Sequence, residues 1–213
     1  MKFVISYSCG KDSTLALHKT IAAGHEPVGL IVMYNEGADR SWFHGVDPRL
    51  LDRIAEALEI PLILCPASGE KYHLALEEKL RYAVAIGAEM CVFGDIDIED
   101  HAAWCRERCK NAGIRAGFPL WQRNRRENTE EAVNLGYKCL IKCINNKLLP
   151  REYLGREIDR SMIDDMEKRG IDVCGENGEY HTIVLDGPIF KKPVEYTVGD
   201  KLDFGDISVV DIH

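Results

Sequence analysis

Short apolar runs alternate with longer segments of helical periodicity along the N-terminal part of the chain. Runs of about four to six residues, typical of buried strands, occupy positions 3–6, 28–33, 61–65 and 90–93. Between them, leucine, isoleucine and alanine recur at spacings of three and four residues, which predicts helices over 12–22, 48–58, 70–86 and 101–112. Strands that alternate with helices in this way predict an α/β fold with a doubly wound parallel sheet.

The alternation continues more weakly and then changes character. Residues 114–118 and 137–144 read as strands with a helix over 129–135 between them. The pattern then predicts a helix over 161–169 with Ser161 as its N-cap, followed by strands over 183–185, 194–198 and 207–212. We therefore predict a first domain over residues 1–119 and a smaller C-terminal α+β lobe over residues 120–213.

Composition places the chain among ordinary globular proteins. Of its 213 residues 46% are apolar, which suffices for a buried core. No apolar run reaches the roughly 18 residues of a membrane-spanning helix, and the N-terminus lacks the pattern of a signal peptide. The eight cysteines are scattered, which favours reduced thiols and a cytoplasmic location.

Two local features, a basic stretch and two cysteine pairs, can each be interpreted in two ways. The formal net charge of −8 argues against broad nucleic-acid binding. The basic stretch 123–126 is either a local RNA-docking patch or a solvated loop before a helix. Two cysteine pairs, each four residues apart, are either a four-thiolate metal site or ordinary buried thiols: Cys105 with Cys109 and Cys139 with Cys143.

A polar loop joins the first predicted strand to the first predicted helix, with the sequence Ser8-Cys9-Gly10-Lys11-Asp12-Ser13. A helix N-terminus directs unpaired N–H groups and a positive dipole end at one point, and Lys11 adds an ammonium. This combination favours a phosphate site. The alternative is a helix start capped by Asp12 or Ser13. The loop is not a Walker loop, because Asp12 follows the lysine and no glycine lies five positions before Gly10.

A second polar segment, residues 175–182, precedes a predicted strand. Two glycines enclose Glu176 and Asn177, and Glu179, Tyr180 and His181 follow. A polar turn would explain the glycines and the asparagine. It would not require two carboxylates, a phenol and an imidazole together, so we interpret the segment as part of a functional site.

Both segments resemble known motifs. The first resembles the PP-loop, Ser-Gly-Gly-Lys-Asp-Ser, of the N-type ATP pyrophosphatases, with Cys9 in place of a glycine. We therefore expect position 9 not to require a positive φ. Residues 174–182 resemble the Cys-Gly-Glu-Gly-Gly-Glu-Tyr-Glu-Thr signature of the diphthine–ammonia ligase family, with Asn177 and His181 as departures. Further matches run in the family's order over nearly the whole chain, among them Gly24-His25-Glu26, Phe93-Gly94-Asp95-Ile96, Pro119-Leu120-Trp121 and Leu185-Asp186-Gly187-Pro188.

The resemblance implies a fold similar to the adenine nucleotide α-hydrolases (HUP type) and an ATP-dependent, AMP-forming carboxylate–ammonia ligase. Such an enzyme adenylates a carboxylate, releases pyrophosphate and amidates the acyl group with ammonium, using ATP and Mg²⁺. The implied acceptor is diphthine on elongation factor 2 in an archaeal or eukaryotic source, and another carboxylate in a bacterial one. We also expect a homo-oligomer.

The resemblance assigns roles to residues. The expected catalytic residues are Lys11, Asp12, Glu176 and Glu179, with Asp12 as the Mg²⁺ ligand. The expected nucleotide-binding residues are Ser8, Cys9, Gly10, Lys11, Asp12, Ser13, Met33, Gly94 and Asp95. Met33 would offer backbone contacts to adenine, and Glu179 is alternatively a metal ligand. Asp95 is alternatively a structural helix N-cap.

The expected acceptor-binding residues are Trp42, His44, Asn177, Tyr180 and His181. Trp42, Phe43 and His44 are interpreted as a lid or stacking surface, or alternatively as residues packed under a long loop. Two rival functions stay open at this point. One is a PP-loop enzyme that thiolates tRNA, and the other is an ATP-binding sensor without chemistry.

Overall fold

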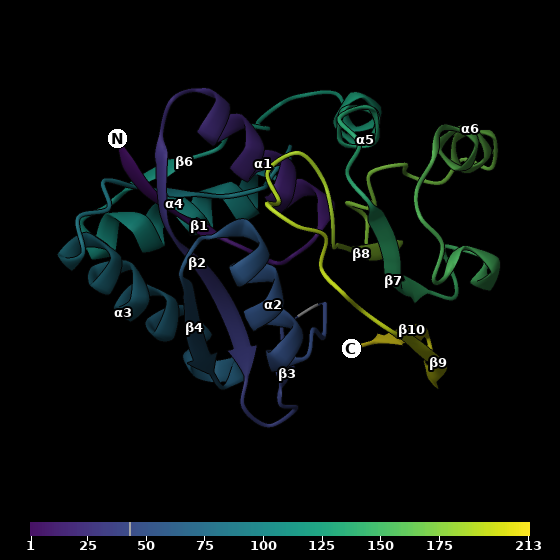
Figure 1. Ribbon diagram of the computed structural model, residues 1–213, viewed down its shortest axis with the longest axis horizontal. Coiled ribbons are helices and arrows are strands. Elements are labelled where there is room, and N and C mark those ends of the chain that lie inside the picture. The colour runs from purple at the N-terminus through teal and green to yellow at the C-terminus, as the bar shows by residue number, and fades with distance from the viewer. Residues whose placement is uncertain (43) are drawn as a thin grey trace.

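The computed structural model describes residues 1–42 and 44–213, and contains two β-sheets that lie next to each other (Figure 1). The first sheet is built from β1 (Lys2–Ser6), β2 (Glu26–Asn35), β3 (Arg40–Ser41), β4 (Leu62–Ala67), β5 (Met90–Val92) and β6 (Arg115–Gly117). Its parallel strands follow the order β4-β2-β1-β5-β6, and β3 pairs antiparallel with the end of β2. The predicted doubly wound parallel sheet is confirmed.

The strand order reverses beside β1. The chain proceeds from β1 to β2 and β4 on one side, and then crosses to β5 and β6 on the other. Ligands of such sheets bind outside the carboxyl ends of the strands, where the order reverses. The fold therefore directs the loop after β1 into the position where a ligand is expected.

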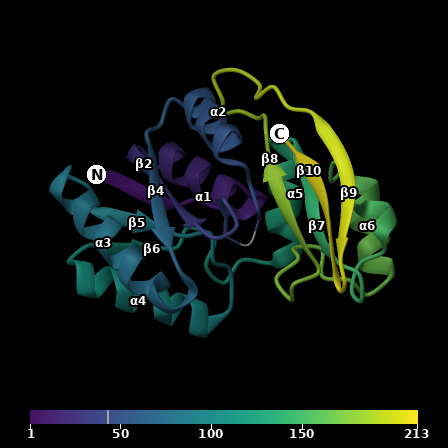
Figure 2. The same cartoon turned by 90° about the horizontal axis from the view of Figure 1, so that it is seen from below.

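Four helices cover the first sheet, and the alternation of side chains along the strands decides which face each covers. They are α1 (Lys11–Ala22), α2 (Pro48–Leu58), α3 (Tyr72–Ala85) and α4 (Glu99–Ala112), with a short 3₁₀ turn η1 (Gly69–Lys71) before α3. Phe3 and Ile5 belong to the same buried cluster as α1 and α2. Val4 and Ile31 belong to the cluster of α3 and α4. Figure 2 shows α2 and α3 on opposite sides of the sheet.

The second sheet is antiparallel and has the order β8-β7-β10-β9. Its strands are β7 (Cys139–Asn145), β8 (Tyr180–Val184), β9 (Val198–Phe204) and β10 (Ile207–Ile212), accompanied by α5 (Arg125–Asn134), α6 (Arg160–Lys168) and the 3₁₀ turn η2 (Arg151–Tyr153). Strand β7, read from the sequence as continuing the alternation of strands and helices, pairs antiparallel with β8 and β10 and so does not extend the first sheet. The predicted smaller α+β lobe is confirmed, whereas its boundary at residue 119 stays a prediction.

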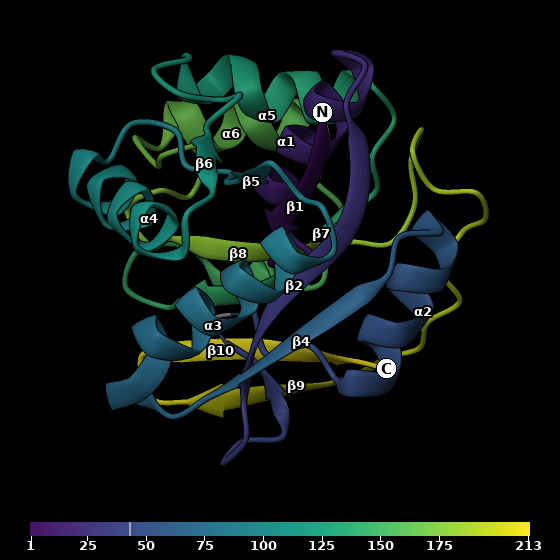
Figure 3. The ribbon, with the colours of Figure 1, turned by 90° about the vertical axis from the view of Figure 1, so that its left-hand side faces the viewer.

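Strand β8 joins the two sheets at the polar loop of residues 8–13, which we call the phosphate loop after its predicted role. The Lys11 N–H donates to Thr182 Oγ1 at 2.9 Å, and the Val184 N–H donates to the Cys9 carbonyl at 2.8 Å. One hydrophobic cluster runs through both parts, from Phe3 of β1 to Ile212 of β10. Figure 3 shows β8, β9 and β10 running across the direction of β2. The second lobe is thus packed onto the first at the loop between β1 and α1.

Several local predictions needed correction. The N-cap of α6 is Asp159, whose Oδ1 accepts from the Met162 N–H at 2.7 Å, and not Ser161. The helix predicted from 129 begins at Arg125, because Asn124 caps it. The strand predicted over 194–198 lies at Val198–Phe204, where the chain pairs with β10.

The cysteine pairs do not form a metal site in the described part of the chain. Cys105 and Cys109 are buried in α4 beneath the first sheet, whereas Cys139 and Cys143 are buried in β7 of the second. Pairs in different sheets cannot share one tetrahedral ion. They are ordinary buried thiols, as the second alternative stated. Among the described residues, no helix has both the length and the apolar character needed to cross a bilayer.

Gly94 provides a test of how closely β5 approaches α1. A Cβ atom on Gly94 would lie 2.8 Å from the Ser13 backbone nitrogen and 2.9 Å from the Asp12 carbonyl carbon. Backbone cannot move aside cheaply, so Gly94→Ala should reduce the free energy of unfolding by about 1–3 kcal/mol. Gly69→Ala, where no atom lies within 4 Å of the new Cβ, should change it by less than about 0.5 kcal/mol. Urea denaturation measures both, and equal effects would contradict the close approach.

Candidate active site

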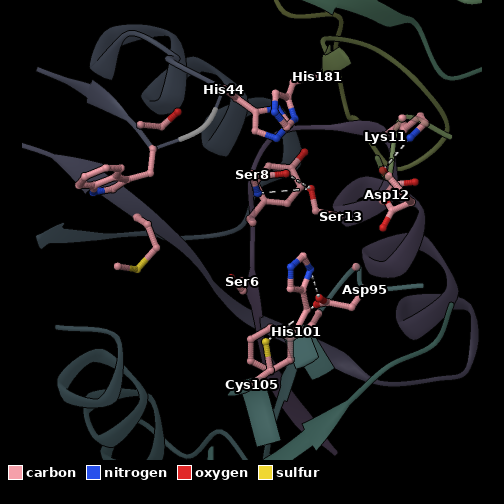
Figure 4. A pocket seen from close by; sticks show the side chains of 18 of the residues that line it. Ser6, Ser8, Lys11, Asp12, Ser13, His44, Asp95, His101, Cys105 and His181 are labelled. Carbon is pink, nitrogen blue, oxygen red and sulfur yellow. Dashed lines mark hydrogen bonds and ion pairs between the residues drawn. The ribbon is translucent and has the colours of Figure 1, made fainter. Parts of the chain in front are cut away.

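A cavity of about 620 Å³ lies at the carboxyl ends of β1, β2 and β5. Its walls include Ser8, Met33, Gly94 and Asp95 from the first lobe. The second lobe contributes Cys174, Gly175, Glu176, Gly178, Tyr180, His181 and Thr182. Figure 4 shows side chains from both lobes directed into the same space. The first loop, Met33 and Gly94–Asp95, all expected to bind the nucleotide, thus meet at one cavity.

The phosphate loop is held closed by its own serines. The Ser8 and Ser13 hydroxyl oxygens lie 3.1 Å apart, Ser8 Oγ accepts from the Gly10 N–H at 3.3 Å, and Ser13 Oγ donates to the Gly10 carbonyl at 3.1 Å. Helix α1 begins immediately after Gly10, without a side-chain cap. The alternative of a helix start capped by Asp12 or Ser13 was therefore wrong. Both hydroxyls lie in the cavity walls instead.

Cys9 contradicts the expectation for its backbone. Its φ is +66°, so the position does adopt the left-handed conformation for which the related motif has glycine. The chain must reverse sharply between strand and helix, and a non-glycine residue adopts this conformation at a cost of about 1–2 kcal/mol. Among the described wall residues, neither Cys9 nor Gly10 is present. A Cβ on Gly10 would lie 2.7 Å from His44 Cε1, so that imidazole covers the loop.

Lys11 connects the two signature segments. Its ammonium donates to Asp12 Oδ2 at 2.7 Å and to the Cys174 carbonyl at 2.5 Å, and the residue is only 4% exposed. Burial lowers the pKa of Lys11, but the Asp12 carboxylate and neighbouring groups raise it well above its ordinary value. The side chain is therefore a buried cation at neutral pH. An ammonium has three N–H donors, so one is available for a ligand in addition to these two acceptors.

Asp12, Cys174 and Glu176 form the candidate cation site among the described residues, with ligand atoms within 4.8 Å of one another. The two carboxylates fit Mg²⁺, which prefers oxygen ligands and is usually held by one or two carboxylates together with phosphate oxygens. Burial raises the pKa of the Cys174 thiol to about 12, so the thiol is protonated and donates to Asp12 Oδ1 at 3.6 Å. It is therefore not a suitable Mg²⁺ ligand.

Glu176 and Asp95 are acids with altered protonation. Burial, and then the negative charge of Asp12, raises the pKa of Glu176 to about 7. Burial also raises the pKa of Asp95, partly offset by His101 at 3.9 Å. The interpretation of Asp95 as a helix N-cap was wrong, because Ile98 occupies that position in α4. A carboxyl that titrates near neutral pH, as that of Glu176 does, is suited to proton transfer.

Glu179 and Asn177 are not among the described wall residues of the cavity. The buried Glu179 carboxylate accepts from the Asn177 N–H at 3.1 Å and from Asn177 Nδ2 at 3.2 Å. Gly175 and Gly178 have φ of +76° and +86°, as a tight turn requires. The two residues shape the loop that presents Glu176, and their expected catalytic and acceptor-binding roles stay predictions.

Two histidines form one wall above the phosphate loop. The ring centroids of His44 and His181 lie 4.7 Å apart, and His44 Nδ1 lies 2.7 Å from the Thr182 carbonyl, to which it donates. Burial and the neighbouring imidazole lower the pKa of His44 to about 3, and burial followed by the Lys11 charge lowers the pKa of His181. Both rings are therefore neutral at pH 7. Tyr180 donates to the Val173 carbonyl at 2.6 Å.

The opposite end of the cavity is aromatic. Trp42 packs edge-on against Tyr72 with centroids 5.8 Å apart, and Tyr72 lies 6.0 Å from Trp104. Val32, Met33 and Leu76 complete this end. The sequence analysis missed Tyr72 and Trp104, because isolated aromatic residues on α3 and α4 resemble core positions. Trp42 donates its backbone N–H to the Met33 carbonyl at 2.9 Å. Phe43 lies outside the described residues.

The basic stretch 123–126 is neutralised by acidic neighbours. Arg123 pairs with Glu131, and Arg125 pairs with Asp97 and Asp172. Arg126 pairs with Glu130, Asp164 and Glu167. Guanidinium groups engaged in this way do not offer a free cationic surface to RNA. The interpretation as a loop before a helix holds for Arg123 and Asn124, whereas Arg125 and Arg126 already belong to the first turn of α5. RNA docking through this stretch stays a prediction.

Comparison with known families identifies the chain. Residues 1–116 match the diphthamide synthase N-terminal domain, and residues 124–213 match the diphthamide synthase C-terminal domain. The chain belongs to the diphthamide synthase family. The family expected from the two motifs is thereby confirmed.

Curated relatives of this diphthamide synthase family member are named diphthine–ammonia ligase. The Homo sapiens protein is 27% identical over 91% of this chain and 82% of its own length. The Danio rerio protein is 28% identical over 91% of this chain and 86% of its length. The Schizosaccharomyces pombe protein is 25% identical over 92% of this chain, but only 36% of its own length is covered.

Solved structures also match, and one of them covers most of this chain. It is described as a predicted subunit of a tRNA methyltransferase from Methanocaldococcus jannaschii, with a TM-score of 0.48 and 14% identity over 88% of this chain and 98% of that one. A TM-score of this size is too low to support a functional inference.

The pKa of Glu176 is directly measurable. In protein stripped of divalent cations, we expect the Glu176 carboxyl to titrate near pH 7. Asp12→Asn should lower this pKa, because it removes a nearby negative charge that disfavours ionisation. Carboxyl ¹³C NMR measures the titration, and Glu176→Gln assigns the signal. An ordinary glutamate pKa in the unaltered protein would contradict the burial and charge described above.

Proposed function

We propose that this member of the diphthamide synthase family is an ATP-dependent ligase that adenylates a carboxylate and amidates it with ammonium. The family match and the diphthine–ammonia ligase relatives support this activity, with diphthine as the acceptor. The observation that carries the proposal is the shared cavity. The phosphate loop and the segment containing Glu176 line it from two different lobes.

Phosphate binding is assigned to the loop after β1. The Ser8 and Ser13 hydroxyls, the Lys11 ammonium and the N-terminus of α1 lie at one end of the cavity. As the acceptor carboxylate attacks the α-phosphorus, negative charge passes to the departing pyrophosphate. Fixed donors and a buried cation beside that charge stabilise the transition state more than the ground state. Lys11 is positioned for this role by Asp12 and the Cys174 carbonyl.

A magnesium ion would be held by the carboxylate of Asp12 together with phosphate oxygens and water, which leaves the neighbouring Glu176 for the ammonium step. When bound, Mg²⁺ neutralises charge on the phosphates of the nucleotide. Asp12 lies 2.7 Å from Lys11, so this carboxylate is held in one orientation whether or not an ion is present. The aromatic end of the cavity, formed by Trp42, Tyr72 and Trp104, is an apolar surface suited to receive the adenine base.

The second half of the reaction requires ammonia rather than ammonium. Glu176, whose pKa is raised to about 7, is the residue suited to accept the proton. The ammonia nitrogen then forms a bond to the acyl carbon, the bond between that carbon and the AMP oxygen breaks, and the surplus proton on nitrogen passes to solvent. The neutral pair His44 and His181 offers uncharged hydrogen-bonding groups to the acceptor on the same side. The homo-oligomeric state and the cytoplasmic location stay predictions.

The rival functions are less well supported. A thiolating enzyme needs reactive cysteines, whereas all eight are buried in the described structure. Burial raises the pKa of the Cys174 thiol in the cavity to about 12. A sensor without chemistry would not require a carboxyl that titrates near neutrality beside the phosphate loop. The tRNA-modifying alternative is not favoured by the relatives' names either.

The identity of the reaction products tests the proposed activity. Protein, ATP, Mg²⁺, ammonium and a diphthine-containing acceptor protein should yield AMP and amidated acceptor in equal amounts, as measured by mass spectrometry. Formation of ADP in place of AMP would refute the proposal. AMP formation without an amide would refute the ammonium step alone.

Lys11→Met tests the phosphate loop. It removes the cation while keeping an unbranched side chain of similar length, and we expect AMP formation to fall by about 10²–10³-fold because one fixed charge at the leaving group is lost. Lys19→Ala is the matched control, because Lys19 is on the same helix and pairs with Glu131 at 2.8 Å outside the cavity. It should retain nearly full activity. Full turnover by Lys11→Met would remove the lysine from the mechanism.

A further inference from the structure

We infer that Arg125 is a positioning residue that fixes the loop carrying Glu176 against the strand-end loop carrying Asp95. The catalytic part of this inference rests on the proposed ligase function. We call the contacts involved the Arg125 clamp, formed by Arg125, Asp97, Asp172 and Asn177. None of the four is among the described wall residues of the cavity.

One side of the Arg125 clamp holds the first lobe. Arg125 Nε donates to Asp97 Oδ2 and Arg125 Nη2 donates to Asp97 Oδ1, both at 2.7 Å. This two-point geometry fixes direction as well as distance. Asp97 follows the cavity residue Asp95 by two positions after the end of β5. The guanidinium therefore anchors the loop that forms one wall of the cavity.

The other side holds the second lobe. Arg125 Nη1 donates to Asp172 Oδ2 at 2.5 Å and to Asn177 Oδ1 at 3.2 Å. The Asp172 carboxylate, whose side chain is only 9% exposed, accepts two backbone N–H groups of the same loop, from Cys174 at 3.0 Å and from Glu176 at 3.2 Å. Arg125 is thus separated from the Glu176 backbone by a single carboxylate.

An arginine is needed for this arrangement. Its planar guanidinium presents five donors in a rigid fork, so one side chain can engage two carboxylates on separate segments. A lysine could supply the charge but not the fixed directions. Arg125 is also the first residue of α5, next to the Asn124 cap. The helix therefore holds the Arg125 backbone in place, and the side chain extends from there to Asp97 and Asp172.

Removing the guanidinium should loosen the Glu176 loop. The Asp172 carboxylate would then be nearly buried without its cationic partner. This favours a rearrangement that hydrates the carboxylate. Such a rearrangement would release the N–H groups of Cys174 and Glu176. Misplacement of a reacting group by about 1 Å can cost roughly 10²-fold in rate.

Arg126 is the matched control for Arg125. It is the next residue in the chain and is also ion-paired. Its three partners all lie in α5 and α6: Glu130, Asp164 and Glu167. None of these partners lies in the cavity walls. A purely structural role for arginine pairs at the start of α5 would make Arg125→Ala and Arg126→Ala behave alike.

The test combines hydrogen exchange with kinetics on the full chain. We expect Arg125→Ala to speed amide exchange in residues 173–178 at least about tenfold, since local opening exposes those amides, while Arg126→Ala leaves it unchanged. AMP formation should show kcat reduced at least about tenfold with the KM for ATP within about threefold, because the phosphate loop is untouched. Arg125→Lys should recover only part of kcat.

The outcomes separate this inference from the proposed ligase activity. Equal exchange and equal kcat in Arg125→Ala and Arg126→Ala would overturn it, as would faster exchange with unchanged kcat. Full recovery of kcat by Arg125→Lys would overturn the requirement for the fork. If the unaltered protein makes no AMP, the proposed function fails, whereas the exchange comparison still decides whether Arg125 fixes the loop.

Discussion

The buried ammonium of Lys11 is the contact on which the arrangement of the site depends. It lies between Asp12 in its own loop and the Cys174 carbonyl in the second lobe, at 2.7 and 2.5 Å. A cation this deeply buried is stable only with close oxygen partners, because desolvation would otherwise favour its neutral form. Cys174 lies 163 positions from Lys11 in the sequence. One charge therefore sets both the local loop geometry and the docking of the two lobes.

Charge distribution around that ammonium divides the cavity into zones with different chemistry. Serine hydroxyls and the α1 N-terminus surround it on the phosphate side, whereas Asp12 and Glu176 make the neighbouring side acidic. Burial and then the negative charge of Asp12 disfavour the ionisation of Glu176 and raise its pKa to about 7. Neutral histidines and an apolar aromatic end complete the walls. Under the proposed function, phosphate binding and proton transfer would therefore take place in neighbouring parts of the cavity with different charge.

Sequence reasoning worked best where local pattern and global fold agree. The helix predicted over 48–58 is α2 within the same bounds, because an Asp-Pro start and strong amphipathicity fix it locally. It failed at β7, whose apolar run suits a strand in either sheet, since periodicity does not encode pairing partners. It also failed at Cys9, where tertiary contacts hold a residue with φ of +66° against its intrinsic preference.

The chain's residues alone determined the parallel α/β core, the phosphate loop at the end of β1 and the family to which the protein belongs. They did so because strand periodicity, helix capping and two dense polar motifs are local in sequence. Tertiary structure decided which motif residues reach the cavity. Glu176 enters it while Glu179 turns away to bind Asn177, and Tyr72 and Trp104 join it from helices without any motif. Those outcomes depend on contacts between residues distant in sequence, which only packing of the two lobes establishes.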